Sequence, residues 1–287
     1  MMTDVLNEIQ NKMPTLSKGQ KKIAQYILDE YDKAAFMTAA VLGKTVQVSE
    51  STVVRFAGEM GYAGYPEMQK ALQDMVLHRL TSVQRMEIGE KQISNQDILT
   101  HVLQGDMERL RYTLDTLDRK ILNGAVDALL DAGKVYILGV RSSEALASFL
   151  YYYLRYIVDD VELITSASST VTLEQLMRLR PADTVVSISF TRYSTAVLQG
   201  AEYAHHIGAK SIVLTDAETS PLAKNADFLL TARCDMISLV SSLVAPMSIL
   251  NALIVSAANC RRKETTALFD QLEEVWDYYH VYEKADE

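Results

Sequence analysis

The chain has 287 residues, of which 48% are hydrophobic, so it can bury the cores of two domains and is too apolar to be disordered throughout. Its two cysteines lack metal-ligand spacing and follow no signal peptide, which predicts buried thiols in a reducing cytoplasm and neither a disulfide nor a metal site. The formal net charge of −9 is unevenly divided: residues 1–88 hold ten basic and ten acidic residues, whereas residues 264–287 hold eight acidic residues against one lysine. An acidic C-terminal part does not argue against DNA contact by a neutral N-terminal part.

Two amphipathic helices are predicted at the start of the chain, one over residues 5–13 that Pro14 ends and one that Ser17 caps. Three lysines lie in the first turn of the second helix: Lys18, Lys21 and Lys22. Cations at this end oppose the helix dipole, at a cost of roughly a few tenths of a kcal/mol. A nearby phosphate would offset that cost, and a solvated lysine face is the alternative.

Residues 49–60 are predicted to form a helix with one buried face and one presented face. Ser49 is a good N-cap, and Gly61 can adopt the left-handed conformation that ends a helix. The buried face consists of apolar residues at i, i+3, i+4 and i+7, namely Val53, Phe56, Ala57 and Met60. A shorter helix capped by Thr38 precedes this one, and only residues 45–48 separate the two.

This spacing is typical of a helix-turn-helix, in which the second helix enters the DNA major groove by its N-terminal residues. The residues that would face the groove are Ser49, Glu50, Ser51, Thr52 and Arg55. An ordinary helical hairpin has the same pattern, and the neutral charge of this part of the chain supplies no strong field toward phosphates. A last helix beyond residue 66 completes an all-α domain over residues 1–78.

Residues 79–96 are polar and lack periodicity, and they form the predicted linker. From residue 97 on, two helices are followed by the alternation of strands and helices that is typical of a doubly wound α/β domain. The five predicted strands cover residues 135–139, 161–165, 184–190, 211–215 and 228–231. The second domain therefore covers residues 97–287, with a mainly parallel sheet flanked by helices, and with C-terminal helices and an acidic tail.

Two loops at the carboxyl ends of these strands, residues 139–143 and 189–194, are rich in hydroxyl groups and lead into helix N-termini. Backbone amides and the helix dipole favour an anion there, so a phosphate-bearing ligand fits both loops. Hydroxyl residues at such junctions are often only N-caps, which is the alternative for each loop. The chain has no Gly-x-Gly-x-x-Gly and no complete Gly-x-x-x-x-Gly-Lys-Ser/Thr loop, so we expect no dinucleotide, no nucleoside triphosphate and no cofactor.

Residues 42–65, which contain the presented helix, resemble the N-terminal domain of the RpiR family of bacterial transcriptional regulators. Residues 135–143, 189–194 and 220–227 are similar to the C-terminal sugar isomerase (SIS) domain of that family. The resemblance implies a cytoplasmic regulator of sugar or amino-sugar metabolism that acts as a homodimer or homotetramer. Its helix-turn-helix would bind operator DNA, and its SIS domain would sense a phosphosugar effector.

The resemblance also implies the effector-binding residues, which match the two SIS phosphate loops: Ser142 and Ser143 in the first, and Ser189, Thr191 and Ser194 in the second, where the family pattern is Ser-x-Ser-Gly-x-Thr. Arg192 replaces the glycine of that pattern, and Arg141 stands where the first loop often has glycine. The two arginines either contact the phosphate or carboxylate of the ligand or fill the pocket. Gln47 similarly occupies a turn position where glycine is common.

A phosphosugar isomerase of the SIS fold is the alternative function. It would need a general acid or base near the sugar carbonyl, and Glu144 and Glu174 are the carboxylates expected near the rim of the sheet. The N-terminal helices favour a regulator without catalytic residues, because an isomerase does not need them.

Residues 236–260 carry no charge and are followed by three basic residues, which imitates a membrane span with a positive flank. Pro246, Asn251 and Asn259 instead favour a helix that is buried in the domain or at a subunit interface. No membrane partner is therefore expected.

Overall fold

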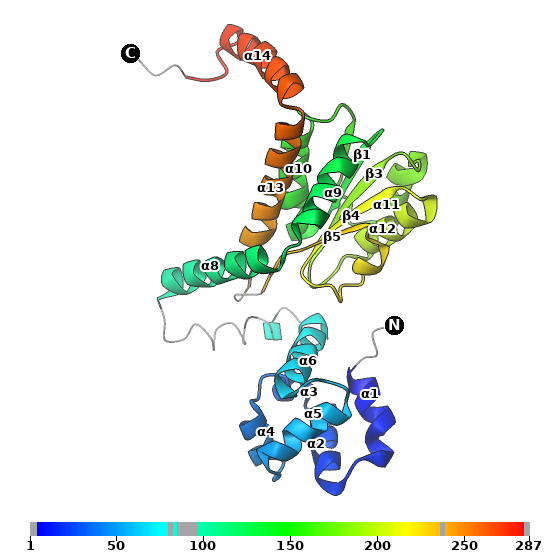
Figure 1. Cartoon of the computed structure of the whole chain (residues 1–287), viewed down its shortest axis with the longest axis vertical. Helices are drawn as coiled ribbons and strands as arrows, with labels where there is room; N and C mark the ends of the chain where they lie inside the picture. The colour runs from blue at the N-terminus through cyan, green and yellow to red at the C-terminus, as the bar shows by residue number, and fades with distance from the viewer. Residues whose placement is uncertain (1–4, 80–82, 85, 87–96, 236–238, 284–287) are drawn as a thin grey trace. The chain divides into compact units, whose positions relative to one another are not determined.

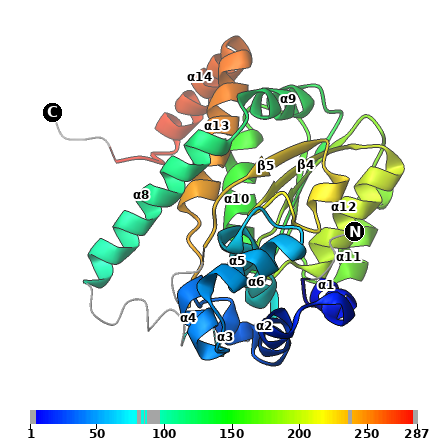
Figure 2. The same cartoon turned by 60° about the horizontal axis from the view of Figure 1, so that its bottom comes forward.

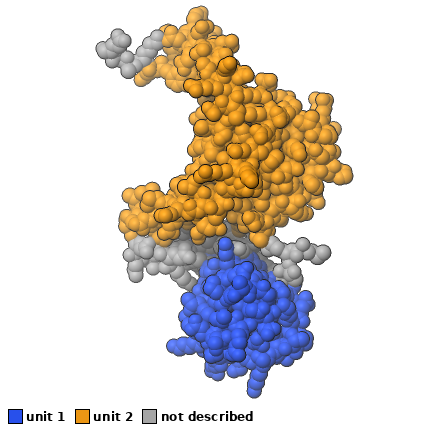
Figure 3. Space-filling model, in the orientation of Figure 1, with its two compact units in different colours: residues 1–88 blue, residues 89–287 orange. Residues whose placement is uncertain are grey.

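The computed structural model describes residues 5–79, 83, 84, 86, 97–235 and 239–283, and the chain divides into two compact units, residues 1–88 and residues 89–287 (Figures 1 and 3). The predicted linker over residues 79–96 lies outside the described residues, apart from Arg79 and residues 83, 84 and 86. The last four residues of the acidic tail and residues 236–238 lie outside them as well.

The described residues of the N-terminal unit form helices joined by turns. The helices are α1 (Val5–Lys12), α2 (Lys18–Asp29), α3 (Tyr31–Ala34), α4 (Ala39–Thr45), α5 (Glu50–Glu59) and α6 (Tyr65–Arg79). They enclose one hydrophobic core, whose largest fully buried side chains are Ile9, Ile23, Ile27, Leu42, Phe56, Met68 and Leu72. The predicted stripe of α5 is confirmed, because Val53, Phe56 and Ala57 are fully buried and Met60 is 2% exposed.

Local signals in the sequence determine where α4 and α5 begin and end. The side-chain oxygens of Thr38 and Ser49 accept the amide hydrogens of Val41 and Thr52, both at 3.3 Å, as expected for N-caps. Gly61, with φ of 90°, ends α5 in the predicted left-handed conformation. Both helices are therefore positioned by their own ends as well as by the core.

The turn between α4 and α5 covers residues 46–49, one residue later than predicted, because Thr45 still belongs to α4. Gln47 has φ of 57°, in the left-handed region that glycine adopts without steric cost. The backbone conformation thus accounts for the glycine that is common at this position in the family the chain resembles.

The C-terminal unit contains one five-stranded sheet in the order β2-β1-β3-β4-β5. Its strands are β1 (Val135–Gly139), β2 (Val161–Ile164), β3 (Thr184–Ile188), β4 (Lys210–Thr215) and β5 (Phe228–Thr231). The predicted strands are confirmed, with ends that differ by at most two residues. The sheet is parallel at all four strand pairs, beyond the mainly parallel sheet that was predicted.

Helices cover both faces of the sheet (Figures 1 and 2). On one face lie α9 (Arg119–Leu130), α10 (Glu144–Leu154) and α13 (Val244–Cys260), and on the other lie α11 (Ser169–Gln175) and α12 (Thr195–Ile207). Alternate residues of β1 enter the two cores: Ile137 the first, Tyr136 and Leu138 the second. Helix α8 (Ile98–Thr116) packs against α13, and α14 (Arg262–Tyr278) buries none of its residues.

Most of the uncharged run of the sequence forms α13. Ile249, Leu250 and Leu253 are buried in the core on one face of the sheet, as predicted for a helix inside the domain, while Val255 on the opposite side is 66% exposed. Among the described residues, no single helix is long and apolar enough to cross a membrane. Helices α13 and α14 reach the required length only together, and they meet at 96°.

We expect Gln47→Gly to raise the free energy of unfolding by about 0.5 kcal/mol, because glycine removes the steric cost of the left-handed residue but adds entropy to the unfolded chain. Urea unfolding followed by circular dichroism measures this effect. Lys44→Gly is the matched control: Lys44 is exposed in the neighbouring helix α4, where glycine should lower the same quantity by about 1 kcal/mol. Equal losses in both variants would show that the conformation of residue 47 carries no cost.

Candidate functional site

The strand order of the sheet reverses between β1 and β3. The chain leaves β1 for α10 on one face of the sheet and leaves β3 for α12 on the other. Gly139 pairs with Ile188, so β1 and β3 end at the same level. In open parallel sheets, ligands bind in the crevice outside the carboxyl ends of the strands at such a reversal. The two predicted ligand loops, residues 139–143 and 189–194, are the loops that flank this crevice.

The loop after β1 presents two serines beside the first turn of α10. Arg141 is exposed and has φ of 57°, which accounts for the glycine often found at this place in the SIS loop. Ser142 is exposed and Ser143 is buried. Gly139 is required at the strand end, because a Cβ there would lie 2.6 Å from the Cβ of Ala147 in α10. The close packing of α10 against β1 therefore positions both serines.

The loop after β3 is held by hydrogen bonds that use part of its predicted ligand set. The buried Ser189 accepts the amide hydrogen of Ser194 at 3.1 Å. The amide and hydroxyl of Thr191 both donate to Oδ2 of Asp216, at 3.1 and 2.5 Å. The hydroxyl of Tyr193 donates to Oδ1 of the same carboxylate at 2.6 Å. In this structure, Thr191 and Ser189 hold the loop in shape, while Ser194 is half-buried at its end.

Asp216 is the residue of this rim that the sequence analysis missed. It follows β4 directly, at the same edge of the sheet as the two loops, and Thr215 also lies within 3.2 Å of its carboxylate. Burial raises the pKa of the Tyr193 hydroxyl well above its usual range, and the nearby Asp216 charge raises it further. Tyr193 is therefore a neutral donor to Asp216 at neutral pH. An acidic residue at the carboxyl end of a strand was the available signal.

The expectation for Glu174 is wrong, because this carboxylate does not lie near the rim. Glu174 lines a groove with Lys134 and Glu162, which lie at the amino ends of β1 and β2. Helix α11 carries it back along the sheet, away from the loop that follows β2. Glu144 is exposed in the first turn of α10, so it is placed at the rim as expected.

Neither helix at the crevice is capped by the side chain of its N-cap residue. Ser143 precedes α10 and Ser194 precedes α12, and neither accepts a capping hydrogen bond, in contrast to Ser49 and Thr38. The alternative that these serines serve only as caps is therefore not supported. Uncapped first-turn amides together with the helix dipole form the usual arrangement for binding an anion.

The two arginines of the rim, Arg141 and Arg192, are both exposed. Within the described part of the chain, neither takes part in an ion pair. An exposed guanidinium does not fill a pocket, and it can reach a phosphate or carboxylate in bidentate geometry.

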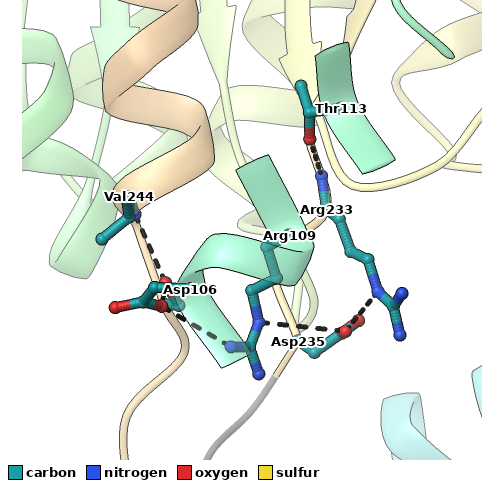
Figure 4. A network of polar contacts seen from close by, with 7 residues as sticks. Asp106, Arg109, Thr113, Arg233, Asp235 and Val244 are labelled. Atoms are coloured by element: carbon teal, nitrogen blue, oxygen red, sulfur yellow. Dashed lines mark hydrogen bonds and ion pairs between the residues drawn. The ribbon is translucent and has the colours of Figure 1, made fainter. Parts of the chain in front are cut away.

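The segment after β5 is bound to α8 by a cluster of charged side chains (Figure 4). The guanidinium of Arg109 on α8 lies between two carboxylates: its Nη1 is 3.5 Å from Asp106 and its Nε is 3.9 Å from Asp235. Each carboxylate has a closer partner, because Ser242 donates to Asp106 and Arg233 donates to Asp235, both at 2.5 Å. The Arg109 side chain is only 12% exposed, so these charges interact in a partly desolvated environment.

Cys234 stands in the chain between Arg233 and Asp235, two members of this cluster. Burial raises the pKa of its thiol to about 12, and the charges of Asp216 and Asp235 raise it further. The thiol is therefore protonated at neutral pH. The prediction of a buried thiol is confirmed for Cys234 and wrong for Cys260, which is exposed at the end of α13, where the helix leaves the domain core.

The residues predicted to face DNA lie at the start of α5. Four of them, Ser49, Glu50, Ser51 and Arg55, are exposed, while Thr52 is half-buried. The hydroxyl of Ser49 lies 2.9 Å from that of Ser51 and 2.8 Å from that of Thr52. Nε of Arg55 donates to the carbonyl of Ser51 at 3.3 Å, which orients the guanidinium along the presented face.

The first turn of α2 packs beside the first turn of α5. A Cβ on Gly19 would lie 3.5 Å from Thr52, so the three neighbouring lysines are brought to the predicted DNA-facing end. Lys18, Lys21 and Lys22 are all exposed there. Their exposure fits both a phosphate-contacting role and a solvated lysine face, and Arg55 is one of several cations near the presented helix.

The two units define a class of protein in which a helix-turn-helix is joined to a doubly wound α/β domain with hydroxyl-rich loops at its strand ends. Models of protein families match both parts: the helix-turn-helix domain of the rpiR family matches residues 3–77, and the SIS domain matches residues 128–256. The chain therefore has the two domains of an RpiR-type transcriptional regulator.

Relatives and solved structures agree with this assignment. The HTH-type transcriptional regulator HexR of Escherichia coli strain K12 is 29% identical over 79% of this chain and 77% of its own length. The sugar isomerase domain of an RpiR transcription factor from Sphaerobacter thermophilus is 27% identical, with a TM-score of 0.59 over 62% of this chain and 99% of that one. The Vibrio vulnificus NanR protein, solved in complex with ManNAc-6P, shares the fold at 23% identity and a TM-score of 0.59 over 96% of this chain and 98% of its own.

We expect Asp216→Asn to lower the free energy of unfolding by about 2 kcal/mol, because an amide group would face donors that now meet a carboxylate. The loop over residues 189–194 should lose its shape and any ligand bound there. Urea unfolding and ligand titration measure the two effects. Glu218→Gln, an exposed change two residues away, is the control and should alter stability by less than about 0.5 kcal/mol. Matching results for the two variants would mean that Asp216 does not organise the loop.

Proposed function

We propose that this chain is a cytoplasmic transcriptional regulator of sugar or amino-sugar metabolism whose SIS domain binds a phosphosugar. Binding of the phosphosugar changes the affinity of the helix-turn-helix for operator DNA. The observation that carries the proposal is the pair of uncapped helix starts, α10 and α12, on either side of the crevice between β1 and β3. The NanR protein, which shares the fold, was solved with a phosphorylated amino sugar.

The phosphate group would sit at the start of α10. Ser142 and Ser143 supply hydroxyl donors there, and the first-turn amides and helix dipole supply partial positive charge. Ser194 and the second hydroxyl loop face the same crevice from the other side, while Asp216 and Thr191 keep that loop in place. Arg141 and Arg192 would meet the phosphate or a carboxylate of the ligand from the solvent side.

The DNA contacts would come from both α5 and α2. Ser49, Glu50, Ser51, Thr52 and Arg55 would face the major groove, and the lysines of α2 would contact phosphates beside it. A domain of neutral net charge has little electrostatic affinity for DNA, so tight binding requires two or more copies held together. The regulator would therefore act as a homodimer or homotetramer on operator DNA, with no membrane partner.

The signal would pass through the charged cluster between α8 and the segment after β5. Asp216 lies near the thiol of Cys234, and the next residue, Asp235, is paired with Arg233 and Arg109. Helix α8 is the first described helix after the linker region, so a shift of the rim that moves this segment would move α8. Coupling is reciprocal: a ligand that lowers operator affinity tenfold binds the DNA-bound form tenfold more weakly, about 1.4 kcal/mol in each case.

An isomerase is the alternative function, and it needs a carboxylate or histidine that can exchange a proton with the sugar. Asp216 is occupied as an acceptor for Thr191 and Tyr193, which leaves Glu144 as the rim carboxylate for that role. Incubation with aldose and ketose phosphates, followed by chromatography of the sugars, separates the two functions. Turnover that is lost in Glu144→Gln would establish the enzyme.

Ser142→Ala should weaken phosphosugar binding about tenfold, because one hydrogen bond to a charged oxygen is worth about 1.5 kcal/mol. A thermal-shift screen with matched phosphorylated and unphosphorylated sugars, including ManNAc-6P and its unphosphorylated form, first identifies the ligand, and calorimetry then measures its affinity. Adding Ser189→Ala should abolish the response of DNA binding. Ligand-free operator binding should stay unchanged in both variants.

Ser248→Ala on α13 is the control, because its hydroxyl is bonded to Val244 within the helix. Undiminished binding in the double variant would move the site elsewhere.

Arg55→Ala should weaken operator binding by about 1–3 kcal/mol if the guanidinium reads a base edge. Folding should be unaffected, since Arg55 lies on the exposed face of α5. Fluorescence anisotropy with labelled operator gives the affinity. Lys21→Ala is the comparison: it should weaken binding equally to all sequences and reduce the salt dependence by about one charge. Unchanged binding of folded Arg55→Ala would remove α5 from the groove.

A further inference from the structure

The presented face of α5 contains two residues that its own fold does not require. Val54 is 45% exposed, although its neighbour Val53 is fully buried in the core. Gly58 lies four residues later on the same side, in the last turn of the helix, and glycine is a weaker helix former than alanine. Nothing lies within 4 Å of the position that a Cβ on Gly58 would occupy, so packing does not demand a glycine there.

These two residues share a face with the predicted base-reading residues. At 3.6 residues per turn, Ser51, Val54, Arg55 and Gly58 lie on the side of α5 opposite Val53 and Phe56. This face therefore has a hydroxyl, an apolar group, a guanidinium and a position without a side chain. A helix that lacks a side chain at one position of its exposed face can approach another surface more closely at that position.

We propose that Val54 reads the methyl group of a thymine in the operator and that Gly58 lets α5 enter the major groove deeply enough to make this contact. The inference rests on the proposed DNA-binding function and adds one base preference to it. Thymine is the base that presents an apolar group, its C5-methyl, in the major groove, and small apolar side chains recognise it there. Burial of Val54 against that methyl would remove both apolar groups from water.

Replacement of single thymines by uracil tests the contact, because uracil lacks only the methyl group. The probe is the tightest duplex that the full-length wild-type chain selects from a random library. At one thymine in each half-site, uracil should weaken wild-type binding about fourfold, the equivalent of one buried methyl group. Val54→Ala should bind the thymine and uracil duplexes equally. Val41→Ala, at a valine of α4 that is 49% exposed, is the matched control and should keep the discrimination.

Gly58 provides a second test, in which one substitution should raise the stability of the protein and lower its affinity for DNA. Gly58→Ala should raise the thermal midpoint of unfolding by about 4 °C, because alanine is the better helix former. The same variant should bind the selected duplex at least tenfold more weakly, because its methyl group would hold α5 away from the groove floor.

The outcomes separate this inference from the function on which it rests. If the wild-type chain selects no duplex, the proposed DNA-binding function fails. If it selects one but binds every uracil duplex as well as the thymine duplex, or if Val54→Ala still discriminates, the assignment of Val54 is overturned. Unchanged DNA affinity of Gly58→Ala would overturn the role given to Gly58.

Discussion

The rim of the C-terminal unit depends on one constraint: backbone amides in the first turn of a helix need hydrogen-bond acceptors. At α10 and α12 the N-cap side chains do not supply one, and the reversal of strand order between β1 and β3 brings both helix starts to the same crevice. The close packing at Gly139 on one side and the bonds to Asp216 on the other fix the two loops that carry the hydroxyls. A phosphate in the crevice would accept hydrogen bonds from first-turn amides and from the hydroxyls of the two loops.

Asp216 shows how a binding site is supported by residues that need not touch the ligand. Its carboxylate accepts from Thr191 and from the neutral phenol of Tyr193, and so joins β4 to the loop after β3. Beyond the rim, a separate set of charged contacts holds Asp235 to Arg109 on α8.

Much of this architecture could be predicted from the sequence, because it is encoded by local signals. Ser49 and Gly61 mark the ends of α5, the spacing from Val53 to Met60 marks its buried face, and strands alternating with helices imply the parallel sheet. Both loops of the crevice follow from the same alternation. The positive φ angles of Gln47 and Arg141 agree with the family's glycines at those places, which single-residue preferences would not suggest.

What could not be predicted depends on contacts between distant segments. The position of Glu174 follows from the direction in which α11 runs back along the sheet, and the role of Asp216 follows from the approach of residues 191 and 193 to β4. The position of the α2 lysines matters only because the first turn of α2, at Gly19, lies beside Thr52 in the first turn of α5. In each case the residue type was visible in the sequence, but its neighbours were not.

The bonds that hold α8 to the end of the sheet have a consequence for the order in which the protein forms during synthesis. Thr113 on α8 bonds to Arg233, and Asp106 bonds to Ser242, across 120 and 136 residues of chain. Helix α9 likewise packs against α13, which is made even later. The first helices of the C-terminal unit therefore cannot reach their final packing until nearly the whole domain has emerged from the ribosome. The core of the N-terminal unit, by contrast, lies within the first 76 residues. A nascent chain would carry a finished DNA-binding unit well before it carries a finished sensor.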